Sequence, residues 1–358
     1  MISISVCMIV KNEEEVLDDC LSSIQDIADE IIIVDTGSTD QTKAIAQKYT
    51  EHVIDFEWVN HFAKARNFAF SHATKEYILW MDADDVFLKE DQEKFIQLKQ
   101  TLNTTIDAVS MFYHVGFDAE GNVNFKYRRN RLVKRERDFQ WHGAVHEYLH
   151  VYGHIIPVDI AVTHQKRKKT TPSEPGRNLR IYESMLERNE EMTPRDLFYF
   201  ANELKDHGQH LRAIRFYNEF LATKQCWIED EIRACQYLAD CYLAVDYKEG
   251  AMQSLLRSFL FDQPRPEFCC RLGDYFKEKS KHEAAIFWYQ LALSVPVNDT
   301  AFTLTQYTTW YPHLQLCYCY WQLGNLDQAK KHHVQSEQHY PTHPSVIHNG
   351  EFFKDQEK

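Results

Sequence analysis

The strongest constraint on this chain is a change in apolar periodicity about halfway along it. Up to about residue 165, short apolar runs alternate with helix-like segments, and beyond that point the periodicity is helical throughout. Alternating strands and helices are typical of a parallel sheet with crossover helices. The sequence therefore predicts an α/β domain followed by an all-α domain, and 358 residues suffice for two domains of roughly 150 residues each.

Four apolar runs in the first half are expected to be strands. Glu30–Asp35 is a continuous β-branched run, typical of a strand buried on both faces. Similar runs span Ser3–Val10, His52–Phe56 and Tyr77–Met81, and Phe62–Ser71 between the last two has helical spacing. This order predicts a mostly parallel, Rossmann-like sheet.

The second half contains a repeat. Four alanines, each followed four residues later by a larger side chain, lie about 34 to 44 residues apart, which fits the ~34-residue tetratricopeptide period with insertions. Twelve residues before each alanine stands a small residue, which lets paired helices approach closely. The four pairs are Ala201 and Ala213, Ala239 and Ala251, Gly273 and Ala285, and Cys317 and Ala329.

A basic, proline-containing stretch separates the two patterns. Lys166–Lys169 is followed by Thr170–Pro175, a composition typical of a surface connection. We therefore expect an α/β domain over residues 1–165, a linker and connecting helix over 166–193, and tetratricopeptide-like repeats over 194–358.

Composition argues against several classes of partner. The net charge of −13 argues against nucleic acid, because neutralising phosphates requires clustered cations. No apolar run approaches the ~20 residues of a membrane span, and the start of the chain lacks the features of a secretory signal. The nine cysteines include no C-x-x-C pair, which favours reduced thiols in the cytoplasm.

Acidic residues follow three of the expected strands. Glu13 follows the first, Asp35 ends the second, and Asp82-Ala83-Asp84-Asp85 follows the fourth. Ligands of open α/β sheets bind at this edge, and two carboxylates one residue apart can share a divalent cation that also holds a diphosphate. The alternative is that this acidic segment is a solvated turn with a helix cap before Glu90.

Four segments resemble successive motifs of the family-2 glycosyltransferases with the GT-A fold: Ser5–Glu14, Val34–Asp40, Ala65–Asn67 and Trp80–Asp84. The resemblance covers roughly residues 1–165 and implies inverting transfer from a nucleotide sugar with Mn²⁺ or Mg²⁺. It implies metal ligands at Asp84 and Asp82, to which we add His164. It implies a nucleotide-sugar site at Val10, Glu13, Asp35, Ser38, Arg66, Asp82, Ala83, Asp84, Arg129 and Arg131.

A narrower resemblance rests on Arg128–Leu132, Trp141–Glu147 and Val162–His164, followed by helical repeats. This set is similar to the sublancin-type peptide S-glycosyltransferases and their bacterial relatives. It implies a UDP-sugar donor, with UDP-glucose the first choice, and a Cys or Ser/Thr side chain of a peptide or protein as acceptor. A cell-envelope saccharide or lipid-linked acceptor is the alternative.

An inverting transfer needs a base for the acceptor proton and cations for the charge that develops on the diphosphate. Glu147 is our candidate base and Asp85 the second candidate. Arg129, Arg131 and His164 are candidates for the positive charge. The alternative for Arg129 and Arg131 is that the basic run Lys126–Arg137 is a solvated strand face. The alternative for His164 is an ordinary interdomain histidine, and for Glu147 a contact with a substrate hydroxyl or a salt bridge to that basic run.

Two readings from other classes compete. His146–His150 matches H-E-x-x-H, the zinc protease pattern, which requires a helix. The apolar residues there alternate with a period of two, so we expect a strand, on which the two histidines lie too far apart to share zinc. The chain could also be a binding protein with an inactive transferase domain. The repeats could bind the acceptor or form a homodimer.

Overall fold

The computed structural model describes residues 1–117, 123–165, 176–225, 227–296 and 305–356. Contacts divide the chain into two units, Met1–Glu190 and Glu191–Lys358, which are described separately. The first part of the expected linker, residues 166–175, lies outside the described residues, as does Cys226. Within the described ranges, no helix is both long and apolar enough to cross a lipid bilayer.

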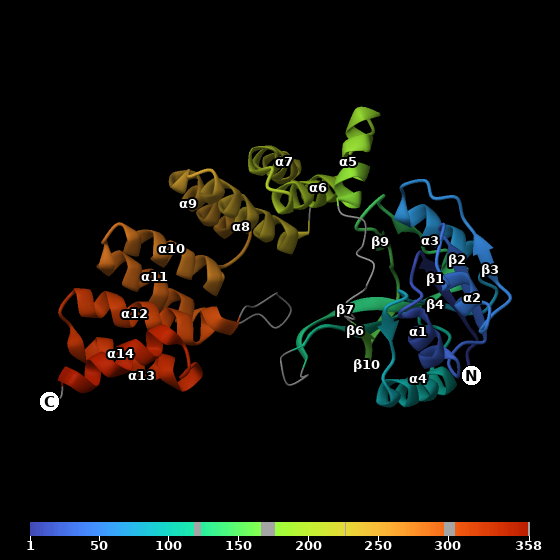
Figure 1. The fold of residues 1–358 in the computed structure, drawn as a ribbon, viewed down its shortest axis with the longest axis horizontal. Coiled ribbons are helices and arrows are strands. Elements are labelled where there is room, and N and C mark those ends of the chain that lie inside the picture. The colour runs from blue at the N-terminus through green and yellow to red at the C-terminus, as the bar shows by residue number, and fades with distance from the viewer. Residues whose placement is uncertain (118–122, 166–175, 226, 297–304, 357–358) are drawn as a thin grey trace. The chain divides into compact units, whose positions relative to one another are not determined.

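The first unit is built on a curled, mostly parallel eight-stranded sheet of the GT-A type (Figure 1). In sheet order its strands are β3 (Val53–Asp55), β2 (Glu30–Asp35), β1 (Ile4–Val10), β4 (Tyr77–Trp80), β7 (Val123–Lys134), β6 (Ala108–Phe117), β10 (Ile155–His164) and β5 (Asp85–Val86). The first four are parallel, as the sequence predicts. β7 and β5 run antiparallel to their neighbours, and β10 is parallel to β6.

Both faces of the sheet are covered, which explains the continuous apolar run of β2. Its residues from Ile31 to Asp35 are all buried. Alternate side chains of β1 and β2 pack with α1 (Leu17–Ile24) and α4 (Lys89–Thr101), and the others pack with α3 (Phe62–Ser71). The short helix α2 (Thr42–Ala46) follows β2, and α5 (Arg177–Glu187) is the last helix of this unit.

The sheet must curl because of the short connection between β4 and β5. Four sheet positions separate these strands, or about 19 Å in a flat sheet. The connection contains only residues 81–84, and Asp85 N donates to Asp82 O at 3.1 Å in a tight turn. Five residue steps reach at most about 17 Å. Curling brings β5 beside the end of β10, where Asp85 pairs with His164.

The second unit consists of helical hairpins of the tetratricopeptide type. Its helices are α6 (Pro194–Asp206), α7 (His210–Thr223), α8 (Ile228–Ala244), α9 (Lys248–Arg257), α10 (Pro266–Glu278), α11 (His282–Ser294), α12 (Trp310–Gln322), α13 (Leu326–His339) and α14 (Pro344–Gln356). The first eight pair in order, as the four repeats predict (Figure 1).

The small residues lie where the helices of each pair meet. Ala201 and Ala213 are wholly buried, and Tyr217 beside them donates to Asn202 Oδ1 at 2.6 Å. The third hairpin repeats this arrangement, with Tyr289 donating to Asp274 Oδ1 at 2.7 Å. In these two hairpins the repeated spacing therefore reflects both close helix approach and a buried tyrosine hydroxyl that has an acceptor.

Gly273 lies where α10 packs closely against the ring of Tyr289 on α11. A Cβ at this position would lie 2.6 Å from the ring of Tyr289. Gly→Ala inside a helix normally stabilises a protein by up to about 1 kcal/mol. Here overpacking reverses the sign, and we expect Gly273→Ala to destabilise the second unit by about 1–3 kcal/mol. Hydrogen exchange of α10 and α11 measures this, and slower exchange in the variant would contradict the prediction.

Candidate active site

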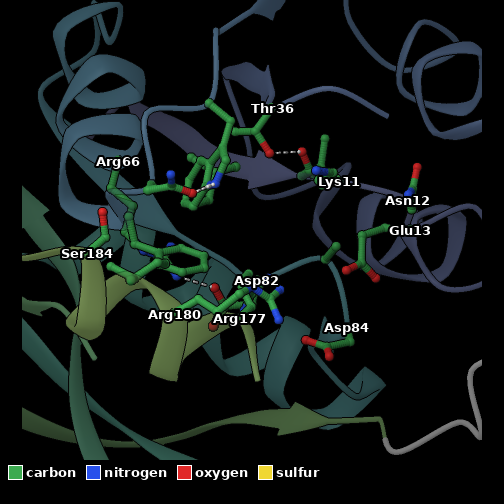
Figure 2. A pocket seen from close by; sticks show the side chains of 17 residues that line it. Lys11, Asn12, Glu13, Thr36, Arg66, Asp82, Asp84, Arg177, Arg180 and Ser184 are labelled. Carbon is green, nitrogen blue, oxygen red and sulfur yellow. Dashed lines mark hydrogen bonds and ion pairs between the residues drawn. The ribbon is translucent and has the colours of Figure 1, made fainter. Parts of the chain in front are cut away.

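A pocket of about 830 Å³ opens at the carboxyl ends of β1, β2 and β4, the edge that the sequence predicts for ligand binding (Figure 2). It lies within the first unit. Its lining residues are Ile9, Val10, Lys11, Asn12, Glu13, Thr36, Trp58, Asn60, Phe62, Arg66, Asp82, Ala83, Asp84, Arg177, Arg180, Ile181 and Ser184.

Arg66 of α3 joins two acidic residues that are far apart in sequence. Its Nη2 lies 2.7 Å from Asp82 Oδ1 and its Nε lies 2.6 Å from Glu147 Oε1. The guanidinium also lies 4.7 Å from the ring centroid of Trp141, which holds it in place. Burial, the largest single effect, would raise the pKa of Asp82, but the charges of Arg66, Arg131 and Arg129 together outweigh it and hold that pKa well below its usual range. Asp82 is therefore a fixed carboxylate at the pocket wall.

Asp84, Asp85 and His164 form the group best suited to a divalent cation. Their ligand atoms all lie within 4.8 Å of one another, with His164 Nδ1 3.5 Å from Asp84 Oδ1 and 3.7 Å from Asp85 Oδ1. His164 Nδ1 and Asp85 Oδ1 are buried without a hydrogen-bond partner among the described residues. Interactions with Asp84 and then Asp85 raise the pKa of His164 to about 9. Two carboxylates and an imidazole fit Mn²⁺ or Mg²⁺.

A buried ion pair lies beneath this group. Arg131 Nη2 lies 2.8 Å from Asp85 Oδ2, and both side chains are fully excluded from solvent. The guanidinium of Arg131 stacks over the ring of Trp80 at 3.9 Å and faces Tyr113 at 4.6 Å. Arg129 on the same strand lies near the ring of Tyr113 and does not line the pocket. Both arginines thus support the floor of the site from within the domain.

Most of the expected site residues fall into two groups. Val10, Glu13, Arg66, Asp82, Ala83 and Asp84 line the pocket. Asp85, His164 and Glu147 contact lining residues without lining the pocket themselves. Of the two aspartates expected to bind a metal ion, Asp82 pairs with Arg66, whereas Asp84 lies beside His164.

Asp35 and Ser38 hold the loop after β2 in shape. Asp35 Oδ2 accepts from Gly37 N at 3.1 Å and from Ser38 N at 2.9 Å. Ser38 Oγ in turn accepts from Asn12 N at 2.9 Å. These contacts join the loop that follows β2 to the loop that follows β1, whose residues Lys11, Asn12 and Glu13 face the pocket (Figure 2).

The zinc protease pattern has no structural support. His146 has a positive φ of 51°, and the strand expected across this region is limited to β9 (Tyr148–Leu149), which pairs with β8 (Trp141–His142). The longer strand expected from the alternation of apolar residues is therefore wrong, because a left-handed residue interrupts it. No helix places His146 and His150 on one face, which the protease chemistry requires.

Sequence reasoning missed two contributors to the pocket. One is the loop bearing Trp58 and Asn60, and the other is α5, which the sequence assigned to a linker and connecting helix and not to the pocket. The spacing of Arg177, Arg180 and Ser184, three and four residues apart, places them on one helical face. That spacing indicates a helix face but not the surface on which the helix packs.

Comparison with known proteins agrees with this fold. Residues 5–155 match the model of glycosyl transferase family 2, and residues 266–296 match a tetratricopeptide repeat model. The first unit therefore carries a family 2 glycosyltransferase domain, and the second carries tetratricopeptide repeats.

Individual relatives match parts of the chain. It is 33% identical over 214 residues to the SPbeta prophage-derived glycosyltransferase SunS of Bacillus subtilis, covering 56% of this chain and 49% of that protein. It is 34% identical over 147 residues to a TPR repeat-containing protein of Synechococcus elongatus, covering 41% and 35%. An uncharacterized glycosyltransferase of Rickettsia conorii is 36% identical over 91 residues, covering 25% and 32%. The chain thus spans about half or less of the length of these relatives.

Proposed function

We propose that the protein is an inverting, metal-dependent glycosyltransferase that moves a hexose from a UDP-sugar, with UDP-glucose the first choice, to a side chain of a peptide or protein. The observation that carries the proposal is the pocket at the sheet edge of the family 2 domain. Asp84 lines this pocket and belongs, with Asp85 and His164, to a group suited to a divalent ion. The donor and acceptor classes come from the resemblance to the sublancin-type peptide S-glycosyltransferases, and the similarity to the glycosyltransferase SunS supports the reaction class.

In this proposal the residues that line the pocket bind and orient the donor. Val10 and Glu13 lie at the end of β1, where the nucleoside would bind, and Asp35 and Ser38 keep the adjoining loop in shape. Arg66 fixes Asp82. Asp84, Asp85 and His164 would hold Mn²⁺ or Mg²⁺, which would supply positive charge to the diphosphate.

The acceptor attacks the anomeric carbon as the bond to the diphosphate breaks, and its proton passes to a base. We assign this role to Glu147 rather than Asp85. Asp85 is fully buried in its pair with Arg131, so its carboxylate cannot reach a substrate. Glu147 keeps 12% side-chain exposure and lies across Arg66 from the pocket residue Asp82.

Glu147→Gln should lower kcat by about 10²–10⁴-fold, the usual contribution of a general base. A peptide whose acceptor is cysteine separates this role from a structural one. A thiol with a pKa near 8.5 ionises without help as the pH rises, so the variant should regain activity between about pH 7 and 9. Initial rates across this range, read by mass spectrometry, provide the test.

The control is Glu136→Gln, which changes a carboxylate that is 67% exposed and pairs with Lys134, away from the pocket. Its rate and pH profile should match the wild type. A loss in Glu147→Gln that stays constant across the pH range would show that Glu147 positions Arg66 instead of taking the proton.

The tetratricopeptide repeats are our proposed acceptor-binding part, because solenoids of this type bind extended chains. Homodimer formation is the alternative role. The eight described cysteines are free thiols, which favours a reducing compartment, and we propose the bacterial cytoplasm.

Incubation with UDP-glucose, Mn²⁺ and candidate peptides tests the function. A gain of one hexose on a peptide side chain is the expected result. Transfer confined to saccharide or lipid-linked acceptors would overturn the acceptor class. Absence of both transfer and donor hydrolysis with every UDP-sugar would favour a binding protein with an inactive domain.

A further inference from the structure

Helix α5 forms one wall of the candidate active site, although it follows the whole region matched by the family 2 model. That region ends at residue 155, and α5 begins at Arg177. Figure 2 draws the side chains of this helix among the pocket residues, together with Asp82 and Asp84. The lining residues that come from α5 are Arg177, Arg180, Ile181 and Ser184.

α5 is held on the first unit by its apolar face. Ile181, Tyr182 and Met185 are buried. Tyr182 Oη lies 3.5 Å from Val145 O, which is the outer limit for a hydrogen bond. Val145 belongs to the loop that also carries Glu147. Burial of three large side chains on one face is worth several kcal/mol and stabilises the helix in place.

Arg177 at the start of α5 has an unused hydrogen-bond donor. Its guanidinium stacks over the ring of Phe62 at 4.7 Å, and Phe62 also lines the pocket. Its Nε is buried and has no hydrogen-bond partner in the described part of the chain. A buried donor without an acceptor is costly, which points to an acceptor supplied by a ligand.

The surroundings of Arg177 favour an anion. Its neighbour Gly176 gives α5 no side-chain cap, so the first N–H groups of the helix add positive potential beside the guanidinium. Arg66, the arginine on α3, differs because Asp82 and Glu147 already balance its charge. The planar guanidinium matches the geometry of phosphate oxygens.

We propose that Arg177 binds a phosphate oxygen of the nucleoside diphosphate part of the donor. This inference rests on the proposed function and adds to it a donor contact from outside the matched family 2 region. Asp84 with its cation would hold the diphosphate from one side of the pocket and Arg177 from the α5 side. Donor binding then depends on the chain beyond the α/β sheet.

Calorimetry with the full-length protein, excess Mn²⁺ and the diphosphates of uridine, guanosine, cytidine, adenosine and thymidine tests the proposal. Arg177→Ala should weaken binding of the preferred diphosphate by about 10-fold or more, the usual effect of losing a charge-assisted hydrogen bond. Arg177→Lys keeps the charge without the planar fork and should give an intermediate loss. Binding of the nucleoside without phosphates should not change in either variant.

The control is Arg215→Ala on α7 of the second unit. Arg215 is 72% exposed, pairs with Glu219 at 2.7 Å and does not line the pocket, so its loss should leave affinity unchanged. Wild-type affinity in Arg177→Ala, with a raised KM for the acceptor, would overturn the inference and place Arg177 on the acceptor side. Failure of the wild type to bind any of the diphosphates would overturn the proposed function as well.

Discussion

Asp84→Ala should lower glycosyl transfer by about 10³-fold or more while leaving the fold intact. Asp84 is the member of the Asp84, Asp85 and His164 group that also lines the pocket. Charge supplied to a departing diphosphate contributes several kcal/mol to transition-state stability, at about 1.4 kcal/mol per tenfold in rate. The side chain is 25% exposed and lies in a turn, so removing it creates no core cavity.

Titration of the variant with Mn²⁺ provides a second measurement that does not depend on activity. We expect Asp84→Ala to bind Mn²⁺ at least about tenfold more weakly than the wild type, because one of three charged or imidazole ligands is lost. Asp55→Ala is the control: its carboxylate is 75% exposed and pairs with Lys43. Unchanged transfer in Asp84→Ala would mean that the cation does not bind at this group.

Asp82→Asn should give a different phenotype from Asp84→Ala, although the two residues are neighbours in the motif. Its carboxylate pairs with Arg66, so the amide leaves that arginine with Glu147 as its remaining carboxylate partner. We expect normal Mn²⁺ affinity with impaired donor binding. Equal loss of Mn²⁺ affinity in both variants, measured by the same titration, would show that the two carboxylates share the ion.

Much of the fold could be predicted because its signals are local. The β-branched run Glu30–Asp35 predicts a strand buried on both faces, and the structure confirms it. The spacing of small residues such as Gly273 predicts the helical hairpins of the second unit. By contrast, β5 contains only Asp85 and Val86, and it is a strand because curling of the sheet brings it beside β10. No local pattern specifies that pairing.

The candidate site divides in the same way. The carboxyl ends of parallel strands meet at one edge of the sheet, so topology alone predicts that Glu13 and Asp84 lie near one pocket. The partner of each carboxylate depends on elements distant in sequence. Asp82 meets Arg66 of α3, and Asp84 meets His164 of β10. These pairings arise from tertiary packing, which is why two adjacent motif residues acquire different surroundings.

Arg131→Met should strongly destabilise the first unit. Both partners of the pair with Asp85 are fully buried, so an apolar side chain at position 131 leaves an uncompensated carboxylate inside the domain. Removing one partner of a buried pair typically costs about 3–5 kcal/mol. His164 lies 3.7 Å from Asp85 and offsets part of that charge, so we expect a loss near the lower end. Hydrogen exchange of the β4 and β10 segments measures it.

The double variant Arg131→Met with Asp85→Leu distinguishes the cost of an unpaired charge from the cost of poor packing. Removing both charges together often leaves stability nearly unchanged, so the double variant should exchange more slowly than either single variant. It should nevertheless be inactive, because Asp85 also belongs to the candidate metal group. If the double variant is as unstable as Arg131→Met alone, then the stacking of Arg131 on Trp80, and not its charge, stabilises the floor of the site. A stable, inactive double variant would instead show that this buried pair serves the site, since the fold does not require it.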